Sequence, residues 1–231
     1  MSLAHVAWSG VAAELDAAGI ATLGALLEPA TCRALIELFD QPQAFRSTVD
    51  MAQHRYGDGH YRYFAYPLPE PVEQLRCELW PHLLPIAREW AGRLRHAAPW
   101  PDEFASWIEQ CHAAGQRRPT PLLLRYGPGG WNALHRDLYG ELVFPLQVVI
   151  GLDRPGADYT GGELVVVEQR PRAQSRATCA SIPQGHGMVI TTRDRPLRTA
   201  RGWSAAPMRH GVSTVRSGRR HTLGLIFHDA T

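Results

Sequence analysis

One short run of the chain combines two side chains that bind metal ions. His135 and Asp137 stand two residues apart in WNALHRD, residues 131–137. If this run forms an extended strand, both side chains project from one face, about 6.6 Å apart at the backbone. An imidazole and a carboxylate placed in this way can bind one cation from the same side. Because a chain with 11 histidines contains such a tripeptide easily by chance, the pattern needs a further ligand.

His210 supplies that candidate ligand, after three intervening expected strands. Two histidines and one carboxylate form the facial triad of non-haem Fe(II) oxygenases, which leaves coordination positions open. A single Fe(II) needs extra electrons to split O₂, and a chelating 2-oxo acid can supply them. The spacing therefore predicts a site for Fe(II), O₂ and a 2-oxo acid at His135, Asp137 and His210.

Two neighbouring arginines, Arg219 and Arg220, follow His210 along the chain. If the 2-oxo acid is 2-oxoglutarate, its far carboxylate needs a fixed cation, and a guanidinium can bind it through two hydrogen bonds. Only one of two consecutive strand residues faces the interior. Thr222 and Gly224 alternate with Arg220, and the small Gly224 would leave room for a ligand. We therefore expect Arg220 to bind 2-oxoglutarate and Arg219 to face solvent.

Three further residues near these motifs are candidates with two interpretations each. The Tyr126 hydroxyl is placed to donate to 2-oxoglutarate, although a half-buried tyrosine at a strand end is also a common packing device. Asn132 is the only asparagine of the chain; it either contacts a co-substrate or substrate edge, or stabilises a turn. Trp131 either stacks on a flat substrate or covers the edge of the core.

The elements that must position these residues differ between the two halves of the chain. Up to about residue 116 the hydrophobic period is mostly helical, as in 30–39 and in 72–94, where Pro81 and Pro85 predict a break or kink. Between those helices, Phe45–Tyr66 is aromatic and rich in glycine, which favours a hairpin or long loop. From Pro121 onward, eight short β-branched or aromatic runs separated by Gly, Pro and Asp predict a sandwich or barrel.

The segment from Tyr126 to Asp229 resembles the 2-oxoglutarate and Fe(II)-dependent dioxygenase superfamily in its H-x-D, distal histidine and arginine pattern. Three stretches are similar, more closely, to a bacterial branch described as oxygenases that oxidatively demethylate damaged DNA: YGPGGWNALHRDLYGELVFPLQVV, GGELVVVEQRPRAQSR and RHGVSTVRSGRRHTLGLIFHDA. An earlier stretch, GDGHYRYFAYPLPEP, matches more loosely. Together these motifs cover roughly half of the chain.

The resemblance implies an α+β protein with a double-stranded β-helix core, jelly-roll or cupin-like, braced by the N-terminal helices. It also implies that His135, Asp137 and His210 bind iron and that Arg220 binds 2-oxoglutarate. No linker divides the chain, so we expect one catalytic domain over residues 1–231. Within it, residues 1–116 are expected to be mainly helical support and lid, and residues 117–231 the jelly-roll core.

The charge distribution points to a polyanionic partner. The basic residues are 24 arginines and no lysine, and beyond residue 169 there are 11 arginines against only Asp194 and Asp229. A local excess of this kind attracts nucleic acid, although GC-rich codon usage also produces arginine. A damaged base would have to be unstacked into the pocket, under an aromatic lid that we expect to contain Tyr56, Tyr61, Tyr63 and Phe64.

Two other functional hypotheses remain at this stage. The same triad and arginine serve hydroxylases of protein side chains, such as prolyl hydroxylases, and of small molecules, because the jelly roll does not define the substrate. A non-catalytic β-barrel that retains a structural metal is the third hypothesis. No apolar run approaches the roughly 18 residues of a membrane span, and the four cysteines are far apart. We therefore expect a cytoplasmic protein with buried, reduced thiols and no membrane partner.

Overall fold

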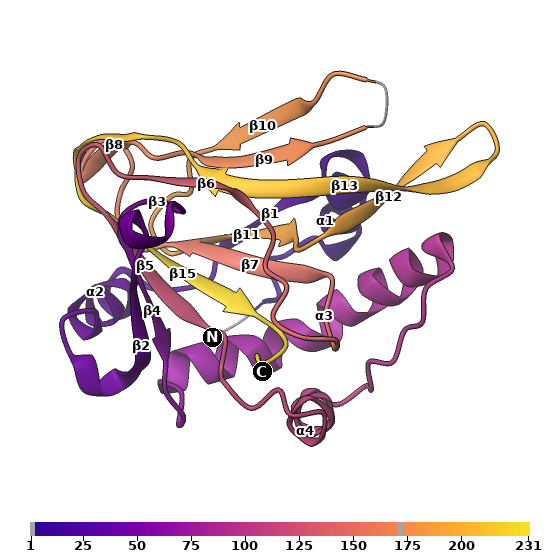
Figure 1. Cartoon of the computed structure of the whole chain (residues 1–231), viewed down its shortest axis with the longest axis horizontal. Helices are drawn as coiled ribbons and strands as arrows, with labels where there is room; N and C mark the ends of the chain where they lie inside the picture. The colour runs from indigo at the N-terminus through magenta and orange to yellow at the C-terminus, as the bar shows by residue number, and fades with distance from the viewer. Residues whose placement is uncertain (1–2, 171–172) are drawn as a thin grey trace.

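Two facing β-sheets form the centre of the molecule, and helices cover the outer face of the larger sheet (Figure 1). The computed structural model describes residues 3–170 and 173–231. The fold is α+β, as expected, and the arrangement of the sheets is that of a double-stranded β-helix. The helices are α1 (Trp8–Ala18), α2 (Pro29–Leu38), α3 (Glu70–Leu94) and α4 (Phe104–Ala113), with short 3-10 turns at Pro42–Ala44 and Ala52–His54.

The larger sheet has the strand order β1-β11-β7-β15-β5-β4-β2, and every pair in it is antiparallel. Its strands come from both halves of the chain, so the N-terminal half is not a separate layer. They are β1 (Ile20–Ala25), β2 (Phe45–Asp50), β4 (His60–Phe64), β5 (Leu122–Tyr126), β7 (Leu146–Gly151), β11 (His186–Thr191) and β15 (Arg220–Ile226).

The smaller sheet has the order β10-β9-β13-β6-β3, and β12 pairs with β13 beyond this path. Strands β8 and β14 form a separate two-stranded pair. These strands are β3 (Gly57–Asp58), β6 (Trp131–His135), β8 (Tyr159–Gly161), β9 (Leu164–Glu168), β10 (Arg176–Ala180), β12 (Asp194–Thr199), β13 (Gly202–Val212) and β14 (Val215–Gly218). All eight strands expected beyond Pro121 are present, and β8, β12 and β14 are additional.

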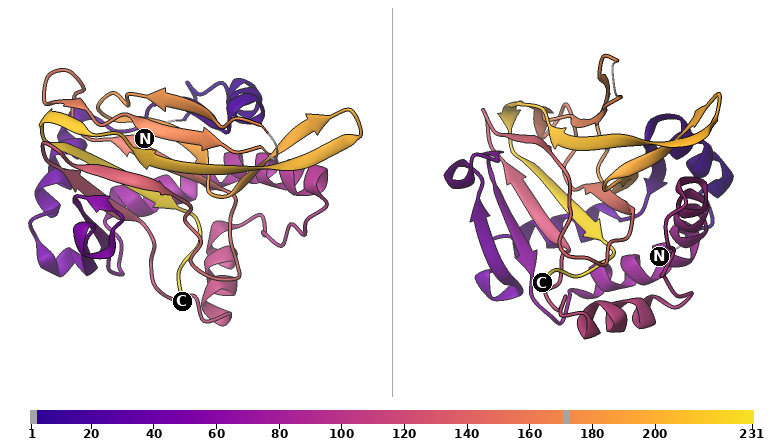
Figure 2. Two further views of the ribbon diagram at one scale, coloured as in Figure 1. Left: turned by 45° about the horizontal axis from the view of Figure 1, so that its top comes forward. Right: turned by 45° about the vertical axis from the view of Figure 1, so that its right-hand side comes forward.

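Alternation along the central strands separates a helix-facing core from the space between the sheets. On β7, Val148 and Ile150 pack with the helices in the main hydrophobic core, whereas Gln147 and Val149 line an inner cavity. Side chains alternate between the two faces of a strand, so one strand serves both the core and the cavity. Figure 2 shows α3 and α4 on the side of the larger sheet turned away from the smaller one.

Helix α3 departs from the sequence-based expectation at its two prolines. It runs without interruption from Glu70 to Leu94 through Pro81 and Pro85, although each proline removes one backbone hydrogen bond. Its buried side chains include Leu79, Trp80, Leu83, Ile86 and Trp90. Packing of this apolar face against the sheet compensates for the lost hydrogen bonds, which a local propensity argument does not include.

Three other expectations about local structure can be compared with the molecule. Residues 45–64 form the antiparallel pair β2 and β4, which confirms the hairpin interpretation. Strand β1 was not expected. Cys32 and Cys111 are buried free thiols, but Cys77 and Cys179 are exposed, so the prediction of buried cysteines was wrong for those two. Within the described residues, no helix is both long enough and apolar enough to span a membrane.

Candidate metal centre and cavity

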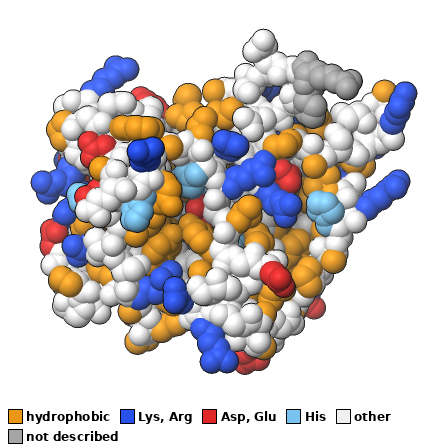
Figure 3. All heavy atoms as spheres, in the orientation of Figure 1, with side chains coloured by type: hydrophobic (Ala, Val, Ile, Leu, Met, Phe, Trp, Pro, Cys, Tyr) orange, Lys and Arg blue, Asp and Glu red, His pale blue; other side chains and the backbone are white. Residues whose placement is uncertain are grey.

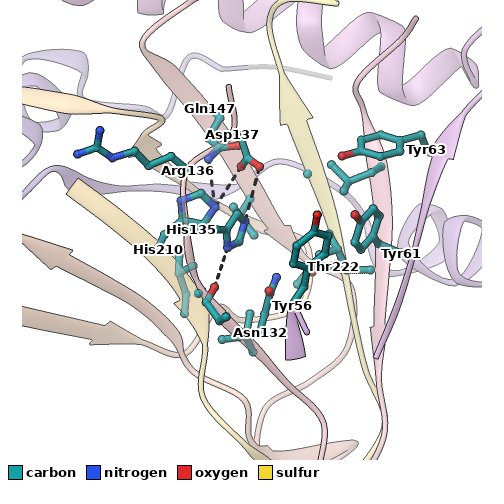
Figure 4. Close-up of a pocket in the computed structure, with 18 of the residues that line it drawn as sticks. Tyr56, Tyr61, Tyr63, Asn132, His135, Arg136, Asp137, Gln147, His210 and Thr222 are labelled. Carbon is teal, nitrogen blue, oxygen red and sulfur yellow. Dashed lines mark hydrogen bonds and ion pairs between the residues drawn. The ribbon is translucent and has the colours of Figure 1, made fainter. Parts of the chain in front are cut away.

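The three predicted metal ligands meet between the two sheets. His210 on β13 pairs directly with His135, the last residue of β6, and their ring centroids are 4.3 Å apart. One ligand atom from each of His135, Asp137 and His210 lies within 4.8 Å of the others. Asp137 follows the end of β6, so the expectation that it belongs to the strand was wrong. Figure 4 shows all three side chains turned toward one point.

Hydrogen bonds fix the ligand atoms that His135 and Asp137 present. His135 Nδ1 lies 2.8 Å from the Ala133 carbonyl oxygen, so the proton on Nδ1 donates there and the lone pair remains on Nε2. Burial, with the charge of His210, lowers the pKa of His135, although Asp137 opposes this. Burial would raise the pKa of Asp137, but a hydrogen bond from His210 and the charges of both histidines hold it well below its usual value. A neutral imidazole and an ionised carboxylate are the forms that bind a metal.

A pair of tyrosines on the cavity wall supports Asp137. The Tyr139 hydroxyl donates to Asp137 Oδ1 at 2.7 Å and accepts a hydrogen bond from the Tyr63 hydroxyl at 2.9 Å. Burial, together with the charge of Asp137, raises the pKa of Tyr139 well above its ordinary value, so the phenol stays protonated. Asp137 Oδ2, which lies 3.1 Å from His210 Nε2, remains for a metal ion. Contacts of this kind orient metal ligands.

A cavity of about 320 Å³ opens beside the triad. Its walls include Arg220, Thr222 and Gly224 of β15, the residues that the alternation argument placed toward the interior. Arg219 is exposed, as that argument expected. Tyr56, Tyr61 and Tyr63 line the cavity across from the triad (Figure 4).

Arg220 is a buried cation without a matching anion. Arg220 is 1% exposed, its Nε has no hydrogen-bond partner, and its Nη1 makes a long hydrogen bond of 3.4 Å to Thr222 Oγ1. The Tyr159 hydroxyl also interacts with this guanidinium. Among the described residues, no carboxylate oxygen lies within 4 Å of its guanidinium. An unpaired buried charge is costly, so the pocket is prepared for an anion. Gly162, at φ +66°, makes room, because a Cβ there would lie 2.8 Å from Arg220 Cδ.

The residues present therefore fit both implied groups. Two imidazole nitrogens and one carboxylate oxygen on one side of a cavity are the donor set of non-haem Fe(II) sites. The orphaned guanidinium of Arg220 fits the far carboxylate of 2-oxoglutarate.

The other predicted site residues lie around this centre in different ways. Tyr126 is fully buried beside Arg220, whose guanidinium carbon is 5.5 Å from the ring centroid. Burial raises the pKa of Tyr126 to about 12, although the charge of Arg220 opposes this. Asn132 lines the cavity, and its amide donates to the Tyr126 hydroxyl at 3.2 Å. Trp131 is 43% exposed and stands outside the cavity wall. Phe64 is fully buried in the main core, so its assignment to the lid was wrong.

Two contacts of the triad were not found from the sequence. Tyr139 lies two residues beyond Asp137, but nothing in its neighbourhood marks it as a hydrogen-bond donor. Gln147 Nε2 lies 3.4 Å from His210 Nε2. Here the sequence contains a usable signal, because Gln147 is the lone polar residue in the apolar run FPLQVVIGL, and such a residue in a buried strand needs a polar partner.

Comparison with known proteins identifies similar chains. A family model described as "Oxygenase, catalysing oxidative methylation of damaged DNA" matches residues 59–230. Two uncharacterized proteins from strains of Mycobacterium tuberculosis are each 64% identical over 167 residues, which is 72% of this chain and 72% of each relative.

Solved structures with the same fold include several oxygenases. A Pseudomonas putida prolyl-4-hydroxylase has a TM-score of 0.57 at 15% identity, covering 97% of this chain and 99% of that chain. A Burkholderia pseudomallei oxidoreductase of the 2OG-Fe(II) oxygenase family has a TM-score of 0.52 at 18% identity, covering 100% and 96%. A Trichoplax adhaerens prolyl hydroxylase, solved with a peptide fragment of hypoxia inducible factor, has a TM-score of 0.57 at 14% identity, covering 96% and 89%. At these identities the likeness is one of fold.

Proposed function

Because the chain belongs to the family of oxygenases described as acting on damaged DNA, we propose that it oxidatively removes methyl groups from the bases of alkylated DNA. The family makes the protein an oxidoreductase, so the hypothesis of a non-catalytic barrel is not retained. Family, fold and donor set together imply Fe(II), 2-oxoglutarate and O₂ as cofactor and co-substrates. The observation that carries the proposal is the single cavity that joins the triad, Arg220 and three tyrosines.

Each side chain of the cavity has a distinct task in this proposal. His135, Asp137 and His210 hold Fe(II) from one side and leave the side toward the cavity open. Arg220 binds the far carboxylate of 2-oxoglutarate. Tyr126 is not part of the cavity wall but is buried beside Arg220, and we assign its hydroxyl the role of a donor to the same molecule. The chemistry supplied by the bound iron and co-substrate is oxidation of a C–H bond by O₂, with 2-oxoglutarate converted to succinate and CO₂.

The walls of the cavity suit a flat substrate. Tyr56, Tyr61 and Tyr63 present aromatic surface across from the triad, and a flipped base is held by stacking and by hydrogen bonds to its edge. We assign the edge contact to Asn132 and a stacking contact outside the cavity to the exposed Trp131, its neighbour in the chain. The aromatic walls also keep water away from the reacting carbon.

Oxidation of a methyl group on nitrogen leads to removal of that group. One oxygen atom inserted into the C–H bond gives a hydroxymethyl group on nitrogen, and cleavage of the N–C bond then releases formaldehyde and restores the N–H of the base. Addition of a methyl group would require a methyl donor, which this chemistry does not include. We therefore propose demethylation as the reaction.

The test is formaldehyde release from a defined oligonucleotide. Protein loaded with Fe(II) without oxygen is mixed with 2-oxoglutarate and a single strand carrying one N-methylated base, and O₂ is then admitted. The proposal expects succinate and formaldehyde in matching amounts above the level seen with the unmethylated strand. Succinate formation that is the same with both strands, without formaldehyde, would refute it.

A second candidate is hydroxylation of a protein side chain. Its support is the similarity in fold to prolyl hydroxylases, one of them solved with a peptide. The same assay separates the two functions, because a peptide hydroxylase releases succinate with a suitable peptide and retains the oxygen as an alcohol without forming formaldehyde.

A further inference from the structure

A two-stranded hairpin extends from the smaller sheet past the C-terminal end of α3 (Figure 1). It consists of β12 and the first half of β13, which pair from Asp194 opposite Pro207 to Thr199 opposite Gly202. The residues from 198 to 205 are exposed, apart from the half-buried Gly202. Within the described strands, β12 pairs with β13 alone. The C-terminal end of β13 carries the candidate metal ligand His210, but the hairpin at the other end of the strand has no role in the metal site.

The hairpin carries unpaired positive charge. Arg198, Arg201 and Arg209 are exposed, and no carboxylate oxygen of the described residues lies within 4 Å of any of their guanidinium groups. Asp194 is the only acidic residue from 193 to 209, and its carboxylate already contacts Arg136 at 3.5 Å and Arg193 at 3.4 Å. Figure 3 shows blue side chains at the far end of this hairpin, at the right of the view.

Contacts hold the hairpin near its tip and at its root. Near the tip, the Trp203 ring contacts two guanidinium groups, with centroid distances of 4.4 Å to Arg93 on α3 and 5.2 Å to Arg198. Arg93 is itself fixed by Asp16 at 2.7 Å and Glu89 at 2.5 Å. A second anchor is the buried Arg195, whose Nε lies 2.6 Å from Glu168 Oε2. Because the hairpin is already ordered, a ligand that binds it has little conformational entropy to remove.

The same strand connects the hairpin to the metal site. β13 runs from Gly202 at the tip to the ligand His210, eight residues or about 26 Å at about 3.3 Å per residue. Arg136 stands between these ends, because it lines the cavity and its Nε donates to the Met208 carbonyl at 3.0 Å. Arginines are therefore present at the cavity, where Arg136 lies, and toward the tip, where Arg198 and Arg201 are exposed. A nucleic-acid strand advances about 3.4 Å per nucleotide. A strand with one base in the cavity must therefore continue for several nucleotides beyond that base to reach the tip of the hairpin.

We infer that the β12–β13 hairpin is a nucleic-acid-binding arm, in which Arg198, Arg201 and Arg209 bind phosphates of the strand whose base occupies the cavity. This inference rests on the proposed function. Phosphates repeat at a regular interval along a strand and accept bidentate hydrogen bonds from arginine. Arg198 lies opposite Trp203 in register, and Arg209 follows Trp203 by an even number of residues. Both arginines therefore leave one face of the ribbon, which at Arg209 is the face opposite to that of the neighbouring ligand His210. A strand with a base in the cavity would pass around the edge of β13 to reach them.

The test compares a long and a short ligand in one double variant, Arg198→Gln with Arg201→Gln. Both carry the same N-methylated base, in a single strand of 16 nucleotides and in a trinucleotide that is too short to reach the arm. We expect the affinity for the 16-mer to fall about tenfold or more. We also expect the slope of log K against log salt to weaken by about 1.4, or about 0.7 for each lost phosphate contact on a single strand. Affinity for the trinucleotide, and succinate formation without nucleic acid, should stay unchanged.

The control is Arg33→Gln with Arg117→Gln, which removes the same charge from exposed positions outside the hairpin. It should leave binding of the 16-mer unchanged. The inference would be overturned if the hairpin and control variants lost the same affinity for the 16-mer. It would also be overturned if the hairpin variant lost the same affinity for the 16-mer and for the trinucleotide. If the arm variant binds and demethylates the 16-mer as the wild type does, the arm is wrong while the proposed function stands. If the wild-type protein neither binds nor demethylates either ligand, both are wrong.

Discussion

Replacing Arg220 by glutamine should weaken 2-oxoglutarate binding without destabilising the ligand-free protein. Arg220 is buried and lacks an anionic partner in the described structure, so its charge is a cost to folding until an anion binds. A hydrogen bond to a charged group contributes about 1.5–3 kcal/mol, which corresponds to an affinity loss of about 10- to 150-fold. The free energy of unfolding of the ligand-free variant should be equal to or greater than that of the wild type.

Thermal unfolding with and without 2-oxoglutarate measures both effects together. With 2-oxoglutarate at 100 times the wild-type Kd, binding raises the free energy of unfolding of the wild-type protein by about 2.7 kcal/mol. At the same concentration, it raises that of a variant that binds 100-fold more weakly by only about 0.4 kcal/mol. The exposed neighbour supplies the matched control, because Arg219→Gln should keep the full gain. The assignment of Arg220 to 2-oxoglutarate would be refuted if the co-substrate stabilised the wild type and Arg220→Gln equally. It would also be refuted if Arg219→Gln and Arg220→Gln lost this stabilisation to the same extent.

Three further predictions concern the surroundings of the site. Tyr139→Phe should lower Mn(II) or Fe(II) affinity about 10- to 100-fold in a binding titration. Tyr61→Phe is the control, because Tyr61 lines the cavity without a hydrogen bond to the triad, and it should leave the affinity unchanged. Equal effects of the two substitutions would contradict the proposal that the Tyr139 hydroxyl orients Asp137 for metal binding. Gly162→Ala should destabilise the protein by about 1–3 kcal/mol and raise the KM for 2-oxoglutarate, because the new methyl group displaces Arg220; an unchanged KM would argue against that packing. Burial lowers the pKa of His228 to about 4, below its usual 6.5, so the unfolded chain binds more protons between these values. The neutral, buried His228 therefore contributes fully to the free energy of unfolding above pH 6.5, and this contribution decreases by about 3 kcal/mol as the pH falls to 4. In urea unfolding, His228→Asn should lack this part of the pH dependence.

The convergence of the three candidate metal ligands could be predicted in part, because the pattern around them is strongly constrained. The strand alternation around Arg220 depends on backbone periodicity, which the sequence shows directly. His135 and Asp137 also meet as expected, although Asp137 lies beyond the end of β6 and not within the strand. Pairing of His210 with His135 is a long-range contact: the sequence pattern indicated His210 as a candidate ligand, but not its position directly opposite His135.

What could not be predicted depends on tertiary packing. Helix α3 continues through Pro81 and Pro85 because its apolar face is buried, and β1 forms because β11 offers an open edge. The hydrogen bond from Tyr139 to Asp137 depends on where the chain turns after β6. Phe64 was wrongly assigned to the lid because alternation along β4 places it in the main core, on the face opposite Tyr63.

Release of succinate from 2-oxoglutarate by wild-type protein and by Asp137→Ala tests the metal centre most directly. Both proteins are loaded with Fe(II) without oxygen, checked for equal thermal unfolding, and then exposed to O₂. If His135, Asp137 and His210 form the iron site, the wild type releases succinate and the variant releases at least about 100-fold less, since loss of a ligand removes the facial triad. Succinate release by Asp137→Ala at the wild-type rate would contradict this assignment.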